Sequence, residues 1–131
     1  MTIPFWCLFI VCLVPYVWAP FSLPARRQQL GSVDNKNPRA QQALLTGRGA
    51  RAVAAHKNAF EAIATFAPAV VVAHLAQADP VWSARLAETF VVARIAHGVL
   101  YLADLDLLRS LSFGVAMACT VGLFVLAIQA G

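Results

Sequence analysis

Residues 111–130 read LSFGVAMACTVGLFVLAIQA, a run of twenty residues that contains no charged side chain. A helix needs about 20 predominantly apolar residues to cross the hydrocarbon core of a bilayer. A spanning segment must also satisfy its backbone hydrogen bonds internally, which a helix does and a single strand does not. The run therefore predicts a membrane-spanning helix and, with it, an all-α fold.

Three further apolar stretches precede this run, at residues 3–23, 60–77 and 81–102. Of the 131 residues, 60% are hydrophobic and only 12% are charged, a composition that excludes a soluble domain of this size. The two middle stretches carry polar side chains and are weaker candidates than the outer two. We expect one transmembrane domain over residues 1–131, a four-helix bundle with spans at about 3–23, 60–77, 81–102 and 111–130.

The basic residues predict the orientation of the chain. Because cytoplasmic loops are enriched in Lys and Arg, we expect residues 24–59 in the cytoplasm and both termini on the opposite side. The first span is followed by Arg26 and Arg27 and preceded by no basic residue, so we interpret it as retained and not as a cleaved signal. Seven of the ten Lys and Arg residues lie between the first two spans: Arg26, Arg27, Lys36, Arg39, Arg48, Arg51 and Lys57.

The same basic segment favours membrane lipid as a partner, because anionic headgroups attract clustered Lys and Arg. No aromatic residue is interleaved with these charges, so we expect no nucleic-acid partner. We also expect no metal site. His56, His74 and His97 lie on separate segments and have no Cys or carboxylate at i+3 or i+4.

Polar residues at helical spacing mark the two middle segments. Asn37 followed by Pro38 predicts a helix start, from which a helix could run through Arg51 into the membrane, with a weak point at Gly47 and Gly49. Two rows of polar side chains lie on these helices. Arg51, Asn58 and Glu61 fall within about 80° of arc, and Arg94, His97 and Tyr101 within about 60°.

An ionisable group at bilayer depth costs about 2.5–3.5 kcal/mol, so both rows are candidate functional residues. With the predicted orientation, they lie in the cytoplasmic third of the membrane, beside Lys57 and beside Arg109 and Ser110 at the start of the fourth span. Such a pocket has cations for carboxylates, a carboxylate for an ammonium and an amide for a peptide bond, which suits a small zwitterionic peptide. Alternatively, Glu61 pairs with Arg51 or Arg94, and these pairs only hold the helices together. The residues leave both interpretations open.

Three motifs resemble the MAPEG family, the membrane-associated proteins of eicosanoid and glutathione metabolism. Residues 55–61, AHKNAFE, resemble the second-helix motif of a basic residue, Asn and Glu. Residues 94–101, RIAHGVLY, resemble the Arg-x-x-His-x-x-x-Tyr motif of the third helix, and Arg109-Ser110 matches the Arg-Ser that opens the fourth. The motifs occur in the family's order, and the resemblance covers nearly the whole chain.

The resemblance implies a homotrimer of four-helix protomers with glutathione bound between adjacent subunits, near the cytoplasmic face. It implies transferase or peroxidase activity on lipophilic electrophiles, with Arg109 as the catalytic residue that activates the thiol. The rival interpretation is a non-catalytic structural or lipid-binding membrane module. The expected glutathione-binding residues are Arg51, Lys57, Asn58, Glu61, Arg94, His97, Tyr101 and Ser110.

Departures from the family pattern narrow this expectation. Lys57 replaces an Arg of the eicosanoid synthases and presents a point charge instead of a bidentate fork. Phe113 stands where some members have a Tyr. These differences argue against an eicosanoid synthase and are compatible with a bacterial-type member in an inner membrane.

Overall fold

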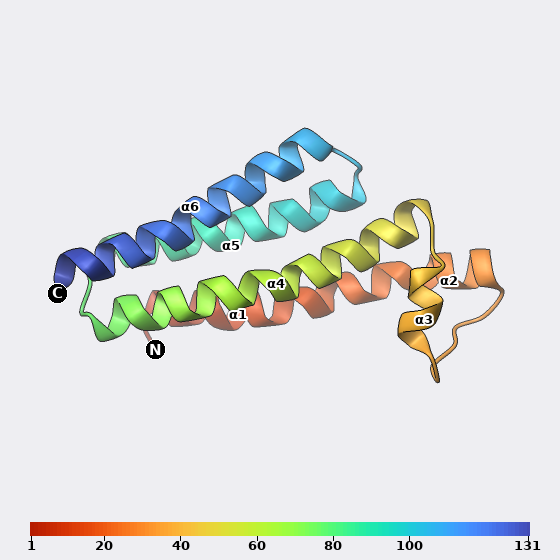
Figure 1. The fold of residues 1–131 in the computed structure, drawn as a ribbon, viewed down its shortest axis with the longest axis horizontal. Coiled ribbons are helices and arrows are strands. Elements are labelled where there is room, and N and C mark those ends of the chain that lie inside the picture. Colours follow the sequence, from red (N-terminus) through yellow and green to blue (C-terminus); the bar gives the residue numbers. More distant parts are fainter.

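The computed structural model describes all residues from 1 to 131 and is helical, with no strand (Figure 1). The prediction of an all-α fold is confirmed. In chain order the elements are α1 (Ile3–Trp18), the 3-10 helix η1 (Ala19–Ser22), α2 (Leu23–Leu30), α3 (Pro38–Ala43), α4 (Gly47–Leu75), α5 (Pro80–Leu102) and α6 (Asp106–Ala130).

The four long helices α1, α4, α5 and α6 lie alongside one another and alternate in direction (Figure 1). Both termini and the α4–α5 turn lie at one end, which we call the terminal end. The segments α2 and α3 and the α5–α6 turn lie at the other, which we call the loop end. Because the helices alternate, the start of α4, the end of α5 and the start of α6 all lie toward the loop end.

The buried core contains mostly small and aliphatic side chains, with two aromatic rings between α4 and α5. Phe66 and Phe90 are almost fully buried, and their rings stack in parallel with centroids 3.8 Å apart. At Gly98 of α5, the indole of Trp18 approaches so closely that a Cβ would overlap the ring. Gly98 therefore allows α1 to approach α5 closely at this point.

Large apolar side chains cover much of the surface, as in Ile128 (78% exposed), Leu107 (70%) and Val92 (68%). Three helical stretches are long and apolar enough to cross a membrane: Ile3–Leu30, Gly47–Leu75 and Asp106–Ala130. Exposed apolar surface on this scale is typical of a membrane protein. The remaining expected span, residues 81–102, forms the helix α5. Because α5 carries three charged residues, it is not apolar enough to be counted with these three stretches.

Two helix boundaries differ from those expected. The first helical stretch continues past residue 23 through η1 and α2, and ends at Gly31, which has the left-handed φ of 79° that glycine adopts readily. The helix expected from Pro38 through Arg51 begins at Pro38 but ends at Ala43, and a new helix starts at Gly47. The expectation of one continuous helix was therefore wrong, and the break lies at the weak point.

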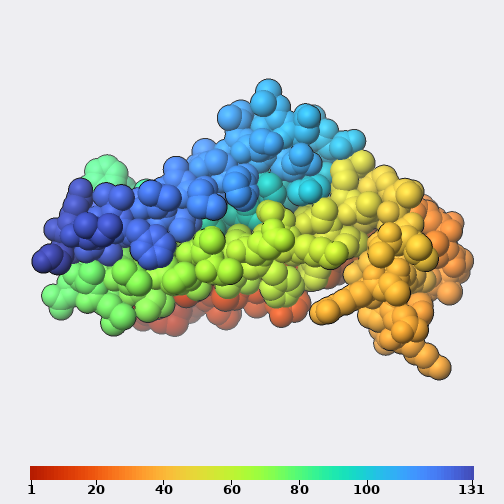
Figure 2. Space-filling model, viewed as in Figure 1, coloured from red at the N-terminus to blue at the C-terminus, as the bar shows by residue number.

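The segment between α2 and α4 projects from the loop end (Figure 2) and is ordered by side-chain hydrogen bonds. Arg26, only 5% exposed, donates from Nε to Gln41 Oε1 (2.5 Å) and from Nη2 to the carbonyl oxygen of Asp34 (2.6 Å). The Asp34 carboxylate accepts from the backbone N–H groups of Asn37 and Lys36, and these bonds lower the pKa of Asp34. The segment between α2 and α4 therefore has a defined structure that side-chain hydrogen bonds hold in place.

Candidate functional site

A cavity of about 170 Å³ opens between α4, α5 and α6, and it contains part of both predicted polar rows. Asn58 and Glu61 enter it from α4, and Arg94 enters it from α5. We call it the polar cavity. Its other lining residues are Ala62, Thr65, Phe90, Phe113, Ala116, Met117 and Thr120.

Arg94 is the most buried charged group of this cavity, with 4% of its surface exposed. Its Nη2 donates to the backbone carbonyl of Asn58 (2.9 Å) and to Asn58 Oδ1 (2.5 Å). The Nε donor of Arg94 is also buried and has no hydrogen-bond partner. Nearly all buried donors in proteins are paired, so Arg94 Nε is an unusual donor in this structure.

Glu61 does not form the ion pair that one interpretation of the sequence required. Its Oε2 accepts from Asn58 Nδ2 (3.1 Å), and its side chain is exposed. The single salt bridge of the chain joins Arg51 to Asp104 at 3.2 Å. The direct pairing of Glu61 with Arg51 or Arg94, which the sequence left open, is not formed. Asn58 bonds to both Glu61 and Arg94, and Arg51 pairs with Asp104.

A second group of predicted residues gathers where α5 meets the start of α6. The guanidinium carbon of Arg109 lies 4.5 Å from the centroid of the Tyr101 ring, a cation–π distance. His97 packs edge-on against Tyr101, with centroids 5.6 Å apart. Tyr101 thus contacts both of the other motif residues, Arg109 and His97.

The hydrogen bonds of His97 assign its tautomer. Nδ1 lies 3.1 Å from the carbonyl oxygen of Arg109, and because a carbonyl only accepts, Nδ1 carries the hydrogen. In the neutral ring Nε2 is then an acceptor, and this buried atom has no partner. Ser112, which sequence reasoning did not select, lies beside this bond and donates to the same carbonyl (2.7 Å).

The remaining predicted site residues lie outside the polar cavity. Arg51 turns to Asp104 in the α5–α6 turn, where Asp104 has a left-handed φ of 63°. Lys57 is exposed. Ser110 is exposed and donates to the carbonyl of Asp106 (3.0 Å) within its own helix.

Sequence reasoning also missed the two threonines of the polar cavity. Thr65 follows Glu61 by four residues and therefore shares its helix face, so the spacing could have identified it. Thr120 lies in the apolar run of α6, and no pattern in the sequence distinguishes it. Both hydroxyls donate to carbonyls of their own helices, Thr65 to Ala62 and Thr120 to Ala116, which leaves their lone pairs as acceptors.

No group of three or more His, Cys, Asp and Glu side chains lies close enough to hold a metal ion. Two guanidinium groups, a carboxylate, an amide and an imidazole lie along α4, α5 and α6, between the middle of these helices and their loop end. Such a set binds polar, charged groups beside an apolar surface.

Comparisons with known proteins give one positive result. No curated protein and no solved structure matches the chain. The model of the MAPEG family matches residues 3–129, which is nearly the whole length. The chain therefore belongs to the MAPEG family.

Proposed function

We propose that this chain is a glutathione-binding integral membrane protein that acts as a glutathione transferase or peroxidase on lipophilic electrophiles. The polar cavity carries the proposal. It brings Asn58, Glu61 and Arg94 together and leaves Arg94 Nε free to donate. Glutathione has two carboxylates, an ammonium and two peptide bonds. Arg94 suits a carboxylate, Glu61 the ammonium and Asn58 a peptide group.

The size of the polar cavity supports a site shared between subunits. Pockets for drug-sized ligands measure about 300–1,000 Å³, whereas this one measures about 170 Å³. One chain thus supplies only part of a tripeptide site. We propose that an adjacent copy in a homotrimer supplies the rest, so that glutathione lies between subunits.

The proposed arrangement in the membrane follows the charges. All four long helices cross, and α5 keeps its one charged residue of the central region, Arg94, buried against its neighbours. The loop end, with residues 24–59, faces the cytoplasm, and both termini face the opposite side. The membrane is of the bacterial inner-membrane type.

Arg109 is the proposed catalytic residue. A free thiol has a pKa near 8.5 and is mostly protonated at neutral pH, and each unit of lowering corresponds to about 1.4 kcal/mol of anion stabilisation. The Arg109 guanidinium lies 4.5 Å from the Tyr101 ring, and this contact supports Arg109 as the cation beside the sulfur. His97 Nε2 is an acceptor that can take the thiol proton.

Two reactions are open to the thiolate. In transfer, sulfur bonds to the electrophilic carbon and the leaving group departs with its electron pair. In peroxide reduction, sulfur bonds to one oxygen, the O–O bond breaks, and the alcohol leaves with a proton. A second glutathione then attacks the sulfenic acid, giving the disulfide and water.

A non-catalytic membrane module is the second candidate, and a specific observation favours it. Arg94 already bonds to Asn58 across α4 and α5, and Arg51 already pairs with Asp104. These contacts hold helices together without any ligand. This candidate predicts that glutathione leaves the thermal stability of the protein unchanged.

Titration of the purified protein with glutathione distinguishes the two. We expect saturable binding by the wild type and at least about tenfold weaker binding by Glu61→Gln, about 1.4 kcal/mol. Arg109→Ala should bind glutathione but conjugate a generic electrophile at least about tenfold more slowly. Arg85→Ala, an exposed arginine at the terminal end, is the matched control and should behave as wild type.

Two results would each reject a different part of the proposal. Absence of saturable binding by the wild type rejects the glutathione proposal and leaves the structural module. Normal conjugation by Arg109→Ala, with binding intact, shows that Arg109 does not activate the thiol.

A further inference from the structure

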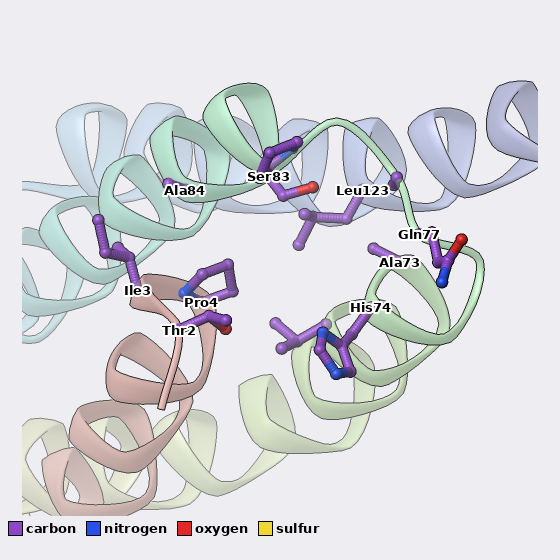
Figure 3. Close-up of a pocket in the computed structure, with 12 residues that line it drawn as sticks. Thr2, Ile3, Pro4, Ala73, His74, Gln77, Ser83, Ala84 and Leu123 are labelled. Atoms are coloured by element: carbon purple, nitrogen blue, oxygen red, sulfur yellow. The ribbon is translucent and has the colours of Figure 1, made fainter.

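A second, larger cavity of about 520 Å³ lies at the terminal end, between the start of α1, the end of α4, the start of α5 and α6 (Figure 3). We call it the terminal cavity. His74, which lines it, follows Glu61 of the polar cavity by 13 residues on α4, or about 20 Å at 1.5 Å per residue. No residue lines both cavities. The proposed glutathione chemistry does not use the terminal cavity.

Four polar side chains line the terminal cavity: Thr2, His74, Gln77 and Ser83 (Figure 3). None of them forms a side-chain hydrogen bond within the protein, although His74 packs edge-on against Phe5. Ser83 is only 7% exposed, and its hydroxyl is buried with no partner. Unpaired buried hydroxyls are unusual, so this group points to a ligand that completes its hydrogen bonding.

The rest of the lining restricts the charge of that ligand. Val70 and Leu123 form a floor that is almost fully buried. No Asp, Glu, Lys or Arg lines the cavity. An ionised headgroup would lose its hydration here without gaining a charged partner, whereas a hydroxyl or carbonyl needs only hydrogen bonds. The volume lies in the range of about 300–1,000 Å³ typical of small-molecule sites.

The position of the cavity indicates where the ligand comes from. Trp6 and Trp82, each more than half exposed, lie on the same end of the molecule, and exposed tryptophans mark the membrane–water boundary. A molecule that partitions at this boundary has a polar head in the headgroup layer and a chain in the hydrocarbon.

We propose that the terminal cavity is a binding site for a neutral single-chain amphiphile from the membrane, such as a monoacylglycerol. Its hydroxyl or carbonyl head bonds to Ser83, Gln77 and His74, and its chain lies on the accessible apolar side chains of the lining, Ile3 and Pro4. The site is independent of glutathione and lies closer to the terminal end of the helices than the polar cavity, which lies near their middle.

Photolabelling tests this site directly. The protein in phosphatidylcholine nanodiscs is irradiated with a 1-decanoylglycerol that carries a diazirine in its chain, and labelled peptides are mapped by mass spectrometry. We expect saturable labelling near Thr2 and Val70–Gln77, competed by unlabelled 1-decanoylglycerol. Decanoic acid should compete at least about tenfold less well, because its ionised head finds no cation.

Three variants locate the head and the chain. Ser83→Ala removes one hydroxyl and should weaken competition about fivefold, as expected for one hydrogen bond. Ala84→Trp fills the cavity and should abolish labelling. Thr89→Trp adds the same ring at an exposed position of α5 outside the cavity and should label as wild type.

Several results would overturn the proposal. These are unsaturable labelling of the wild type, equal competition by decanoic acid, or equal labelling of Ala84→Trp and Thr89→Trp. Ser83→Ala is a small change that keeps the fold, so unchanged competition in that variant rejects the assigned head position even if Ala84→Trp fails to fold.

Discussion

Two arginines of this chain are buried to nearly the same extent. Arg26 of α2 is 5% exposed and Arg94 of α5 is 4% exposed. Each donates to a side-chain amide oxygen and to a backbone carbonyl, and neither forms a salt bridge. The two arginines therefore have the same kinds of hydrogen-bond partner.

The two arginines differ in whether a buried donor remains without a partner. Arg26 uses both Nε and Nη2, and none of its buried donors lacks a partner. Arg94 uses Nη2 for both of its bonds and keeps a buried Nε without a partner, at the wall of a cavity. The hydrogen bonds of Arg26 therefore order the chain around it, whereas Arg94 keeps one donor that a ligand could use.

The largest expected effect is the loss of stability in Arg26→Ala. The variant leaves Gln41 Oε1 and the Asp34 carbonyl without their charged donor, which should lower the free energy of unfolding by about 2–3 kcal/mol. Thermal melting and limited proteolysis of residues 31–46 measure it. Arg27→Ala, its exposed neighbour, is the control and should change stability by less than about 0.5 kcal/mol. Equal melting of the two variants would show that Arg26 does not organise this segment.

A smaller effect is expected for Arg94→Lys, and it should fall on binding instead of stability. The ammonium can keep a bond to Asn58 but has no Nε, so glutathione affinity should fall about tenfold, or about 1.4 kcal/mol. Calorimetric titration gives the affinity and thermal melting the stability. Arg26→Lys is the matched change and should leave affinity unaltered. Unchanged affinity in Arg94→Lys would remove the distinction drawn between the two arginines.

The smallest expected effect is the pH dependence of stability in the segment that Arg26 orders. Bonds from the backbone of Asn37 and Lys36 lower the pKa of Asp34, so its ionised form stabilises the folded chain. This contribution is complete above about pH 4, the ordinary carboxyl value, and is lost as pH falls through the lower folded-state pKa. Acid should therefore reduce the melting temperature of wild type more than that of Asp34→Asn. Parallel pH curves for the two proteins would contradict this.

Helical spacing correctly predicted part of the arrangement of side chains on α4. Asn58 and Glu61 share a face of α4 and are hydrogen bonded, as residues three apart can be. Arg51 shares that face in angle but lies seven residues earlier, about 10 Å along the axis, where Asp104 is its partner. Spacing gives the direction of a side chain around a helix, whereas its partner depends on the depth of the neighbouring helices.

The basic segment of residues 24–59 shows the same limit. Its seven Lys and Arg residues predicted an exposed cytoplasmic loop, and most of them are exposed. Arg26 is buried because Gln41, fifteen residues later, folds back onto it. No local pattern distinguishes Arg26 from Arg27, because that contact depends on how the whole segment turns.

By itself the sequence determined the membrane class, the helical fold, the two polar rows and the family, because hydropathy, periodicity and motifs are properties of neighbouring residues. Only the tertiary structure decided that Arg94 bonds to Asn58 and not to Glu61, that Arg51 pairs with Asp104, and that two separate cavities lie at different levels along the helices. Those outcomes depend on how far each helix is shifted and rotated against the next, which is set by packing such as that of Trp18 on Gly98.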